Sequence, residues 1–155
     1  MGTEAVVPHI TKVFTCWQNS SMHVLPGVSK LSPSHDLLVV ENMLSSVVSF
    51  LKFCPDLLLA VPDALNRLTA LLEKLFPLIA SGGRFEHEGT SPVGSARLSS
   101  ARSSIMEAYS WLPPGSFPLS ADRIFIFAAN QIQVCISSLF WNHVICYLRC
   151  ILFLF

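Results

Sequence analysis

Residues 34–81 read SHDLLVVENMLSSVVSFLKFCPDLLLAVPDALNRLTALLEKLFPLIAS, and this stretch decides the fold. Its apolar residues recur at intervals of three and four, first over 35–54 and again over 62–81. Such spacing places them on one face of an α-helix, so the stretch predicts two helices. The first apolar face consists of Leu37, Val40, Leu44, Val47, Val48, Leu51 and Cys54. The second consists of Leu65, Leu68, Leu72, Leu75, Phe76 and Ile79.

Residues that start and stop helices flank the first segment. Ser34 or Asp36 can accept a hydrogen bond from a backbone N–H at its start. Pro55 ends the helix, because a proline disfavours helical backbone in the residue before it. Residues 56–61 leave room for one extra turn, so we expect the two helices to fold back antiparallel.

The second segment has the same kind of boundaries. Pro62 suits a first helical turn, where its missing N–H costs little. Asp63 and Arg67 stand four residues apart, a spacing that predicts an ion pair worth a few tenths of a kcal/mol. Gly82 and Gly83 suit a left-handed C-terminal cap.

Both apolar faces are wider than a single pair of helices can cover, which implies neighbouring helices. Helical spacing also occurs over 3–22, 101–111 and 120–136, where Ser120 would cap the last of these segments. We therefore expect an all-α fold, with a helical repeat region over 1–81 and a second helical pair over 101–133.

A linker is predicted over 82–100, which is rich in glycine and serine and nearly free of large apolar residues. Ser91 precedes a proline and Ser100 follows Arg97 by three residues, so both are possible phosphorylation sites. A plain solvated linker is the alternative interpretation of these short motifs.

Composition narrows the function classes. The 155 residues are 52% hydrophobic and only 13% charged, with ten basic and ten acidic residues and a formal net charge of zero. Binding to nucleic acid needs a concentrated basic surface, so a nucleic-acid partner is not expected. Low charge instead predicts a surface that other protein covers. The odd number of cysteines, without a CxxC motif, is typical of buried free thiols in a reducing compartment, and residues 1–18 do not resemble a secretory signal. We expect a cytoplasmic protein.

No group of residues predicts a reaction. Cys54 and His35 could form a nucleophile and base pair only if adjacent, but they stand near opposite ends of one predicted helix. The triplet Glu86, His87 and Glu88 is interpreted as solvated charge, because adjacent residues on a loop do not converge on one ion. GxSxG, Walker-type and HExxH motifs do not occur. We predict no catalytic, metal or cofactor site and therefore no enzyme.

The C-terminal segment 134–155 differs in composition, with 17 apolar residues of 22. One interpretation is a transmembrane helix that anchors the protein by its tail, although Arg149 would be costly within a bilayer. A second is a buried or aggregation-prone helix. A third is a tail foreign to the fold, as in a truncated splice form.

Consecutive antiparallel helical pairs with wide apolar faces are typical of an α-solenoid, in which neighbouring pairs stack into one core. A compact helical bundle fits the same pattern and is the alternative. The segments LNRLTALLEKLFP (65–77) and LPPGSFPLSADRI (112–124) resemble part of the HEAT repeat-containing protein 5 family. The resemblance covers about residues 1–133.

This resemblance implies an armadillo-like, HEAT-type α-solenoid and a non-catalytic scaffold. It also implies partners among adaptor or trafficking proteins, in clathrin-adaptor-linked vesicle transport between endosome and Golgi. The expected location is cytoplasmic, peripheral to Golgi and endosomal membranes. The alternative function is a small tail-anchored membrane protein that uses residues 134–155, and resistance to an alkaline wash of membranes would distinguish it.

Overall fold

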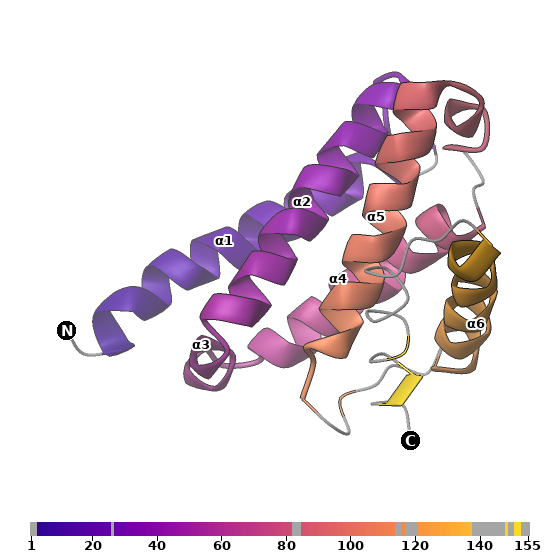
Figure 1. Ribbon diagram of the computed structural model, residues 1–155. Coiled ribbons are helices and arrows are strands. Elements are labelled where there is room, and N and C mark those ends of the chain that lie inside the picture. The colour runs from indigo at the N-terminus through magenta and orange to yellow at the C-terminus, as the bar shows by residue number, and fades with distance from the viewer. Residues whose placement is uncertain are drawn as a thin grey trace.

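The computed structural model describes residues 3–25, 27–81, 85–113, 116, 121–137, 148 and 151–152. Within these ranges the fold is all-α, as predicted, and no β-strand occurs. The elements are α1 (Thr3–His23), α2 (Pro33–Phe53), α3 (Asp56–Ala60), α4 (Ala64–Ala80), the 3₁₀-helix η2 (Glu88–Thr90), α5 (Pro92–Ser110) and α6 (Ala121–Ser137) (Figure 1). The predicted extra turn between the first two apolar segments is α3. The predicted caps Gly82, Gly83 and Ser120 lie outside the described residues.

The start of α2 corrects one predicted cap. Ser32 is the N-terminal cap, and its Oγ accepts a hydrogen bond from the backbone N–H of His35 at 3.3 Å. Pro33 occupies the first turn, where no N–H is required, so the helix begins earlier than expected. Asp36 is instead fully buried, and its Oδ1 accepts a hydrogen bond from Ser29 Oγ at 2.9 Å. That bond ties the preceding loop to the helix.

The predicted ion pair between Asp63 and Arg67 does not form. Asp63 has left-handed backbone, with φ of 59°, and its carboxylate accepts a hydrogen bond from Asn66 at 2.6 Å. Arg67 reaches across to α1, where Nη2 donates to Gln18 Oε1 at 2.7 Å and Thr15 Oγ1 at 3.3 Å. The long side chain therefore joins α4 to α1 instead of bracing its own helix.

The linker expected over 82–100 is much shorter, because α5 begins at Pro92 and continues through 100. Ser91 caps this helix, with its Oγ accepting from Gly94 N–H at 3.0 Å and donating to the Glu88 carbonyl at 3.2 Å. A Cβ at Gly94 would clash with the backbone of Glu88, so glycine is required where η2 meets α5. The buried residues of 85–100 are Phe85, Gly94 and Leu98, too few to give a helical apolar pattern, which is why the segment resembled a linker.

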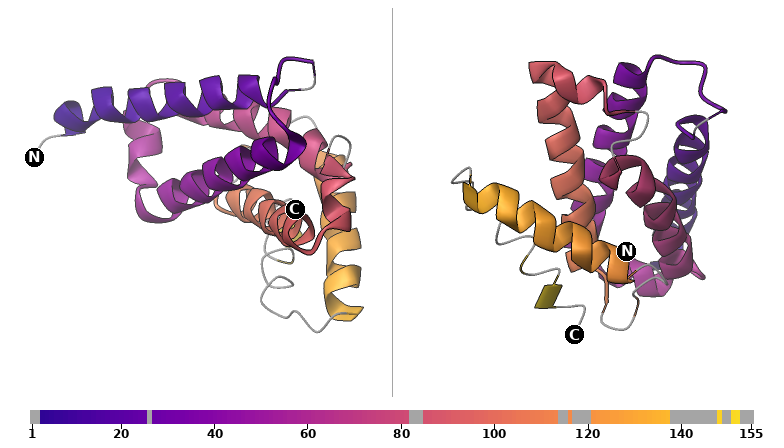
Figure 2. Two further views of the ribbon diagram at one scale, coloured as in Figure 1. Left: turned by 90° about the horizontal axis from the view of Figure 1, so that it is seen from above. Right: turned by 90° about the vertical axis from the view of Figure 1, so that its right-hand side faces the viewer.

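The helices form two layers, with α2 and α5 in one and α1 and α4 in the other (Figures 1 and 2). Two ion pairs fix the direction of α2 against α5. Arg97 Nε lies 4.0 Å from Glu41 Oε2, and Lys52 Nζ lies 2.9 Å from Glu107 Oε1. The residue with the higher number on α2 pairs with the residue with the higher number on α5. The two helices therefore run parallel.

We call the contact between α2 and α5 the seam. Its buried positions alternate at intervals of three and four, the spacing of a coiled-coil interface. On α2 these residues are Leu37, Val40, Leu44, Val47 and Leu51. On α5 they are Gly94, Leu98, Ala101, Ile105 and Ala108. Along α2 leucine alternates with valine, and along α5 a Gly or Ala alternates with Leu or Ile. This alternation of sizes allows close packing of the two helices.

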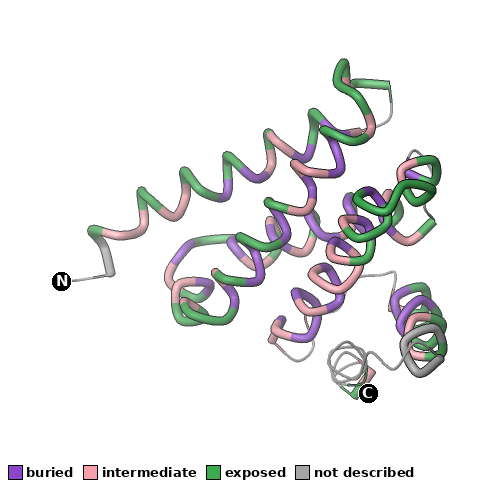
Figure 3. Tube along the Cα trace, turned by 45° about the horizontal axis from the view of Figure 1, so that its top comes forward, coloured by how far each residue is buried: buried purple, intermediate pink, exposed green. Residues whose placement is uncertain are grey.

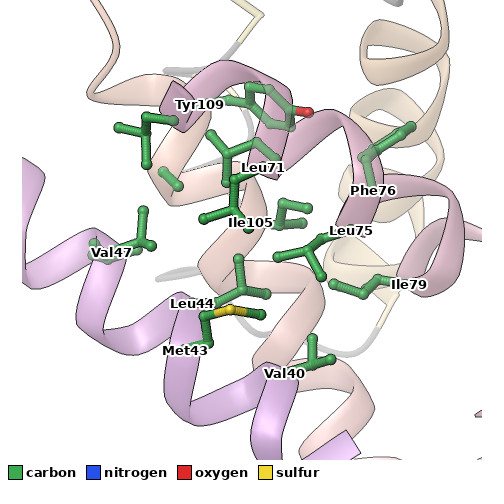
Figure 4. Packing of buried hydrophobic residues seen from close by; sticks show 14 of the residues in the cluster. Val40, Met43, Leu44, Val47, Leu71, Leu75, Phe76, Ile79, Ile105 and Tyr109 are labelled. Atoms are coloured by element: carbon green, nitrogen blue, oxygen red, sulfur yellow. The ribbon is translucent and has the colours of Figure 1, made fainter. Parts of the chain in front are cut away.

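The buried faces of the two layers meet in one hydrophobic core (Figure 3). Ile105 of α5 points into a group formed by Leu44 of α2 and by Leu71 and Leu75 of α4 (Figure 4). On the far side of α4, α6 adds Ile124, Phe127 and Ala128 to the core. The core therefore extends through the layers to the last long helix described.

Candidate functional site

A groove lies between α4 and α6, with a volume of about 390 Å³. Most of its lining is apolar, and a few polar side chains are interspersed with the apolar ones. The lining residues are Glu73, Phe76, Pro77, Ala80, Ser81, Arg123, Ile126, Phe127 and Asn130. Its size and apolar character resemble those of sites that bind small molecules or single side chains.

Aromatic side chains hold the two walls of the groove in place. Phe76 of α4 meets Phe127 of α6 edge-to-face, with ring centroids 5.5 Å apart. The other side of Phe76 packs edge-to-face on Tyr109 of α5, at 6.1 Å. Such stacks are favourable and bulky, so they keep the α4 and α6 backbones apart. The groove follows from this separation.

Pro77 adds a polar feature to the α4 wall. A proline inside a helix has no N–H, so the carbonyl of Glu73, four residues earlier, lacks its usual helical donor. One turn further on, the Pro77 carbonyl accepts hydrogen bonds from both the N–H and the hydroxyl of Ser81. Pro77 therefore removes one regular hydrogen bond from the α4 wall of the groove.

The opposite wall is the exposed side of α6. Ile126 is 59% exposed although it is a large hydrophobic residue, and Arg123 is also exposed one turn earlier. On the α4 wall, the half-buried Glu73 contributes an acidic side chain to the groove. A mainly apolar groove with one acid, one base and an amide is suited to binding an apolar surface.

The two predicted phosphorylation sites occupy different environments. Ser91 is exposed, and its hydroxyl is engaged in capping α5. Ser100 is half-buried in the middle of the same helix. They lie on one helix but are separated by more than two turns, and neither lines the groove.

The other residues considered from the sequence do not come together. His35 lies in the first turn of α2, while Cys54 follows its last residue. Glu86 and His87 are exposed just before η2, and Glu88 is its first residue. Among the residues that the structure describes, no cluster of three or more His, Cys, Asp or Glu side chains is arranged to hold a metal ion.

The segment 134–155 lies mostly outside the described residues. The part that is described shows α6 continuing to Ser137, and Ile151 is partly buried against the core. Leu148 and Leu152 are exposed. No helix in the described ranges has both the length and the apolar character needed to cross a membrane.

Sequence reasoning missed the groove, because α4 and α6 are brought together only by the fold. A local signal was present in Pro77 inside an otherwise regular helical pattern and in Ile126, which falls outside the apolar positions predicted for the helix over 120–136. Comparisons with protein-family models, with curated proteins and with solved structures found no match to this chain.

Proposed function

We propose that this chain is a non-catalytic helical scaffold segment, built as an α-solenoid, that works through contacts with other proteins. The observation that carries the proposal is the arrangement of α1, α2, α4 and α5. Two successive helical hairpins lie side by side, and the seam joins the second helix of one to the second helix of the other in parallel. Stacked hairpins with like helices parallel are the building pattern of helical repeat proteins.

Interactions between the first helices of the hairpins support the same interpretation. Arg67 of α4 bonds Gln18 and Thr15 of α1, and its guanidinium carbon lies 5.7 Å from the ring centroid of Phe14. Both layers therefore have their own contacts between equivalent helices. α6 packs on α4 through the contact between Phe76 and Phe127, and it crosses α4 at a steep angle (Figure 2).

The process that we propose is clathrin-adaptor-linked transport between endosome and Golgi, with adaptor or trafficking proteins as partners. The support is the resemblance of residues 65–77 and 112–124 to the HEAT repeat-containing protein 5 family. The site that best suits a partner is the apolar groove between α4 and α6, because a scaffold binds by surface complementarity and needs no reactive groups.

The test is affinity purification of the tagged chain from cultured cells, with clathrin-adaptor subunits quantified by mass spectrometry. We expect these subunits to be enriched with the wild-type chain and lost with Leu44→Asp, which places a charge in the seam. A second control, Val93→Asp, changes an exposed residue and should retain the enrichment.

Equal recovery of adaptors with all three chains, or with none, would refute the trafficking role. Membrane association that survives an alkaline wash would favour the tail-anchored alternative. The α-solenoid geometry has a separate test, since an experimental structure with α2 and α5 antiparallel would exclude it.

A further inference from the structure

The corner where α2 turns into α3 presents two large hydrophobic side chains to solvent. Phe53, the last residue of α2, is 80% exposed, and Leu59 of α3 is 85% exposed. Burial of either side chain would be favourable, and large exposed apolar groups on a folded surface often mark an interaction site. Asp56, in the first turn of α3, is exposed at the same corner.

The groove between α4 and α6 has complementary properties. Ile126 is exposed at its edge and Phe127 lies within it, so the groove offers apolar surface in a concave form. Arg123 stands one turn before Ile126, on the same face of α6. In the same way Asp56 stands one turn before Leu59. Each surface therefore pairs an exposed aliphatic residue with an exposed charge of opposite sign, while the acid Glu73 lies half-buried on the other wall of the groove.

We propose that the α2–α3 corner of one copy of this chain docks in the α4–α6 groove of a second copy. Leu59 would enter the groove beside Ile126, and Asp56 would pair with Arg123. The volume of about 390 Å³ is sufficient for an aliphatic and an aromatic side chain. A second copy is the occupant favoured by the structure, because one chain carries both an apolar projection beside an exposed acid and an apolar groove with an exposed base at its edge.

The position of the two surfaces determines the kind of assembly. The corner at α3 and the helix α6 lie on opposite sides of the molecule (Figure 1), so a chain cannot fill its own groove. Each copy would use its corner on one neighbour and its groove on another. Such a head-to-tail contact produces a growing series of oligomers unless it closes into a ring. A second copy in the groove would compete with another protein partner for the same site, but sedimentation tests the self-association and adaptor enrichment tests the scaffold role, so either can fail without the other.

Sedimentation velocity of the full chain over a range of concentrations tests the contact. We expect the average mass of the wild type to rise above 17.1 kDa as concentration increases. Leu59→Asp and Ile126→Asp should each weaken self-association by about tenfold or more, because each places a charge in the apolar contact. Val93→Asp, a matched change at a residue exposed elsewhere, should associate like the wild type.

Mixing the two weakened variants gives the decisive result. Leu59→Asp keeps an intact groove and Ile126→Asp keeps an intact corner, so an equimolar mixture should form dimers that grow no further. The charge pair has its own test. Asp56→Lys and Arg123→Glu should each weaken association, and the chain with both substitutions should regain it.

Three outcomes would overturn the proposal. The first is a wild-type chain that stays at the monomer mass throughout the concentration range. The second is self-association unchanged by Leu59→Asp and Ile126→Asp. The third is a mixture of these variants that does not associate, which would indicate a contact of like surfaces. Circular dichroism of each variant serves as the control, because it distinguishes a lower average mass caused by weaker association from an effect of unfolding.

Discussion

The seam between α2 and α5 and the contact between α4 and α6 show how side-chain size sets the distance between helices. In the seam α5 contributes the small residues Gly94, Ala101 and Ala108, so the backbones approach closely and the interface is fully buried. Between α4 and α6 the contact is made by Phe76 and Phe127, and a groove stays open beside the rings. Small residues close one interface, and large aromatic residues leave the other accessible.

The largest expected effect on stability comes from removing side-chain volume, once in the seam and once in the contact between α4 and α6. Leu44→Ala should lower the free energy of unfolding by about 3–4 kcal/mol, because the cavity is enclosed on every side. Phe127→Ala should cost about 2 kcal/mol, less than usual for a phenylalanine, because the adjoining groove already admits water. Urea denaturation followed by circular dichroism measures both. A larger loss at Phe127 than at Leu44 would reverse the comparison.

Adding volume should separate the two interfaces more sharply. Ala101→Leu places a larger side chain in the seam, and overpacking there should cost about 2 kcal/mol. Ala80→Leu makes the same change in a residue that lines the groove, where space exists, and should alter stability by less than about 0.5 kcal/mol. Equal losses in the two variants, measured by thermal or urea unfolding, would show that the groove is not open in solution.

A smaller effect is expected at the start of the seam. Ser91→Ala removes the cap of α5 and should cost about 1 kcal/mol, while Ser91→Asp should keep most of the stability. Ser99→Ala is the control, because Ser99 is exposed on the same helix and caps nothing at its start. Urea titrations compare the three variants with the wild type. A loss in Ser99→Ala as large as that in Ser91→Ala would argue against the capping role.

The smallest effect is expected at the edge of the seam. Lys52→Met breaks the ion pair with Glu107, but the lysine side chain is 41% exposed, so the loss should be about 0.5 kcal/mol or less. High salt should reduce the difference between variant and wild type, since exposed ion pairs are screened. Lys74→Met, at an exposed residue of α4, provides the matched change. A loss above 1.5 kcal/mol that persists in high salt would show that the pair is more than a surface contact.

The same comparison explains what the sequence could predict. Helices with leucine and valine stripes, such as α2 and α4, were located closely because large apolar residues mark the buried face. The first half of α5 was predicted to be a linker, because its buried face consists of Gly94 and a single leucine, Leu98, and its exposed face is rich in serine. The Ser91 and Pro92 start signal and the seven-residue spacing of Gly94, Ala101 and Ala108 were available to correct that prediction.

The groove and the exposed corner depend on information that local patterns do not carry. Ile126 falls outside the main apolar face of α6, and only the position of α4 makes it part of a groove. Arg67 has a possible partner four residues away in Asp63, yet the fold offers it Gln18 on another helix. Which partner a side chain binds, one nearby in the sequence or one on another helix, depends on how the helices pack. The spacing of residues in the sequence does not reveal that packing.

The parallel direction of α2 and α5 has a consequence for synthesis on the ribosome. A hairpin can cover its apolar face as soon as its second helix emerges, but the stripe of α2 must wait for α5. The chain first has to make α3, return through α4 and then build the glycine-containing start of α5. At typical elongation rates this interval lasts on the order of several seconds. During that time the leucines of α2 lack the α5 half of the seam, so this face is completed only after translation has passed residue 110.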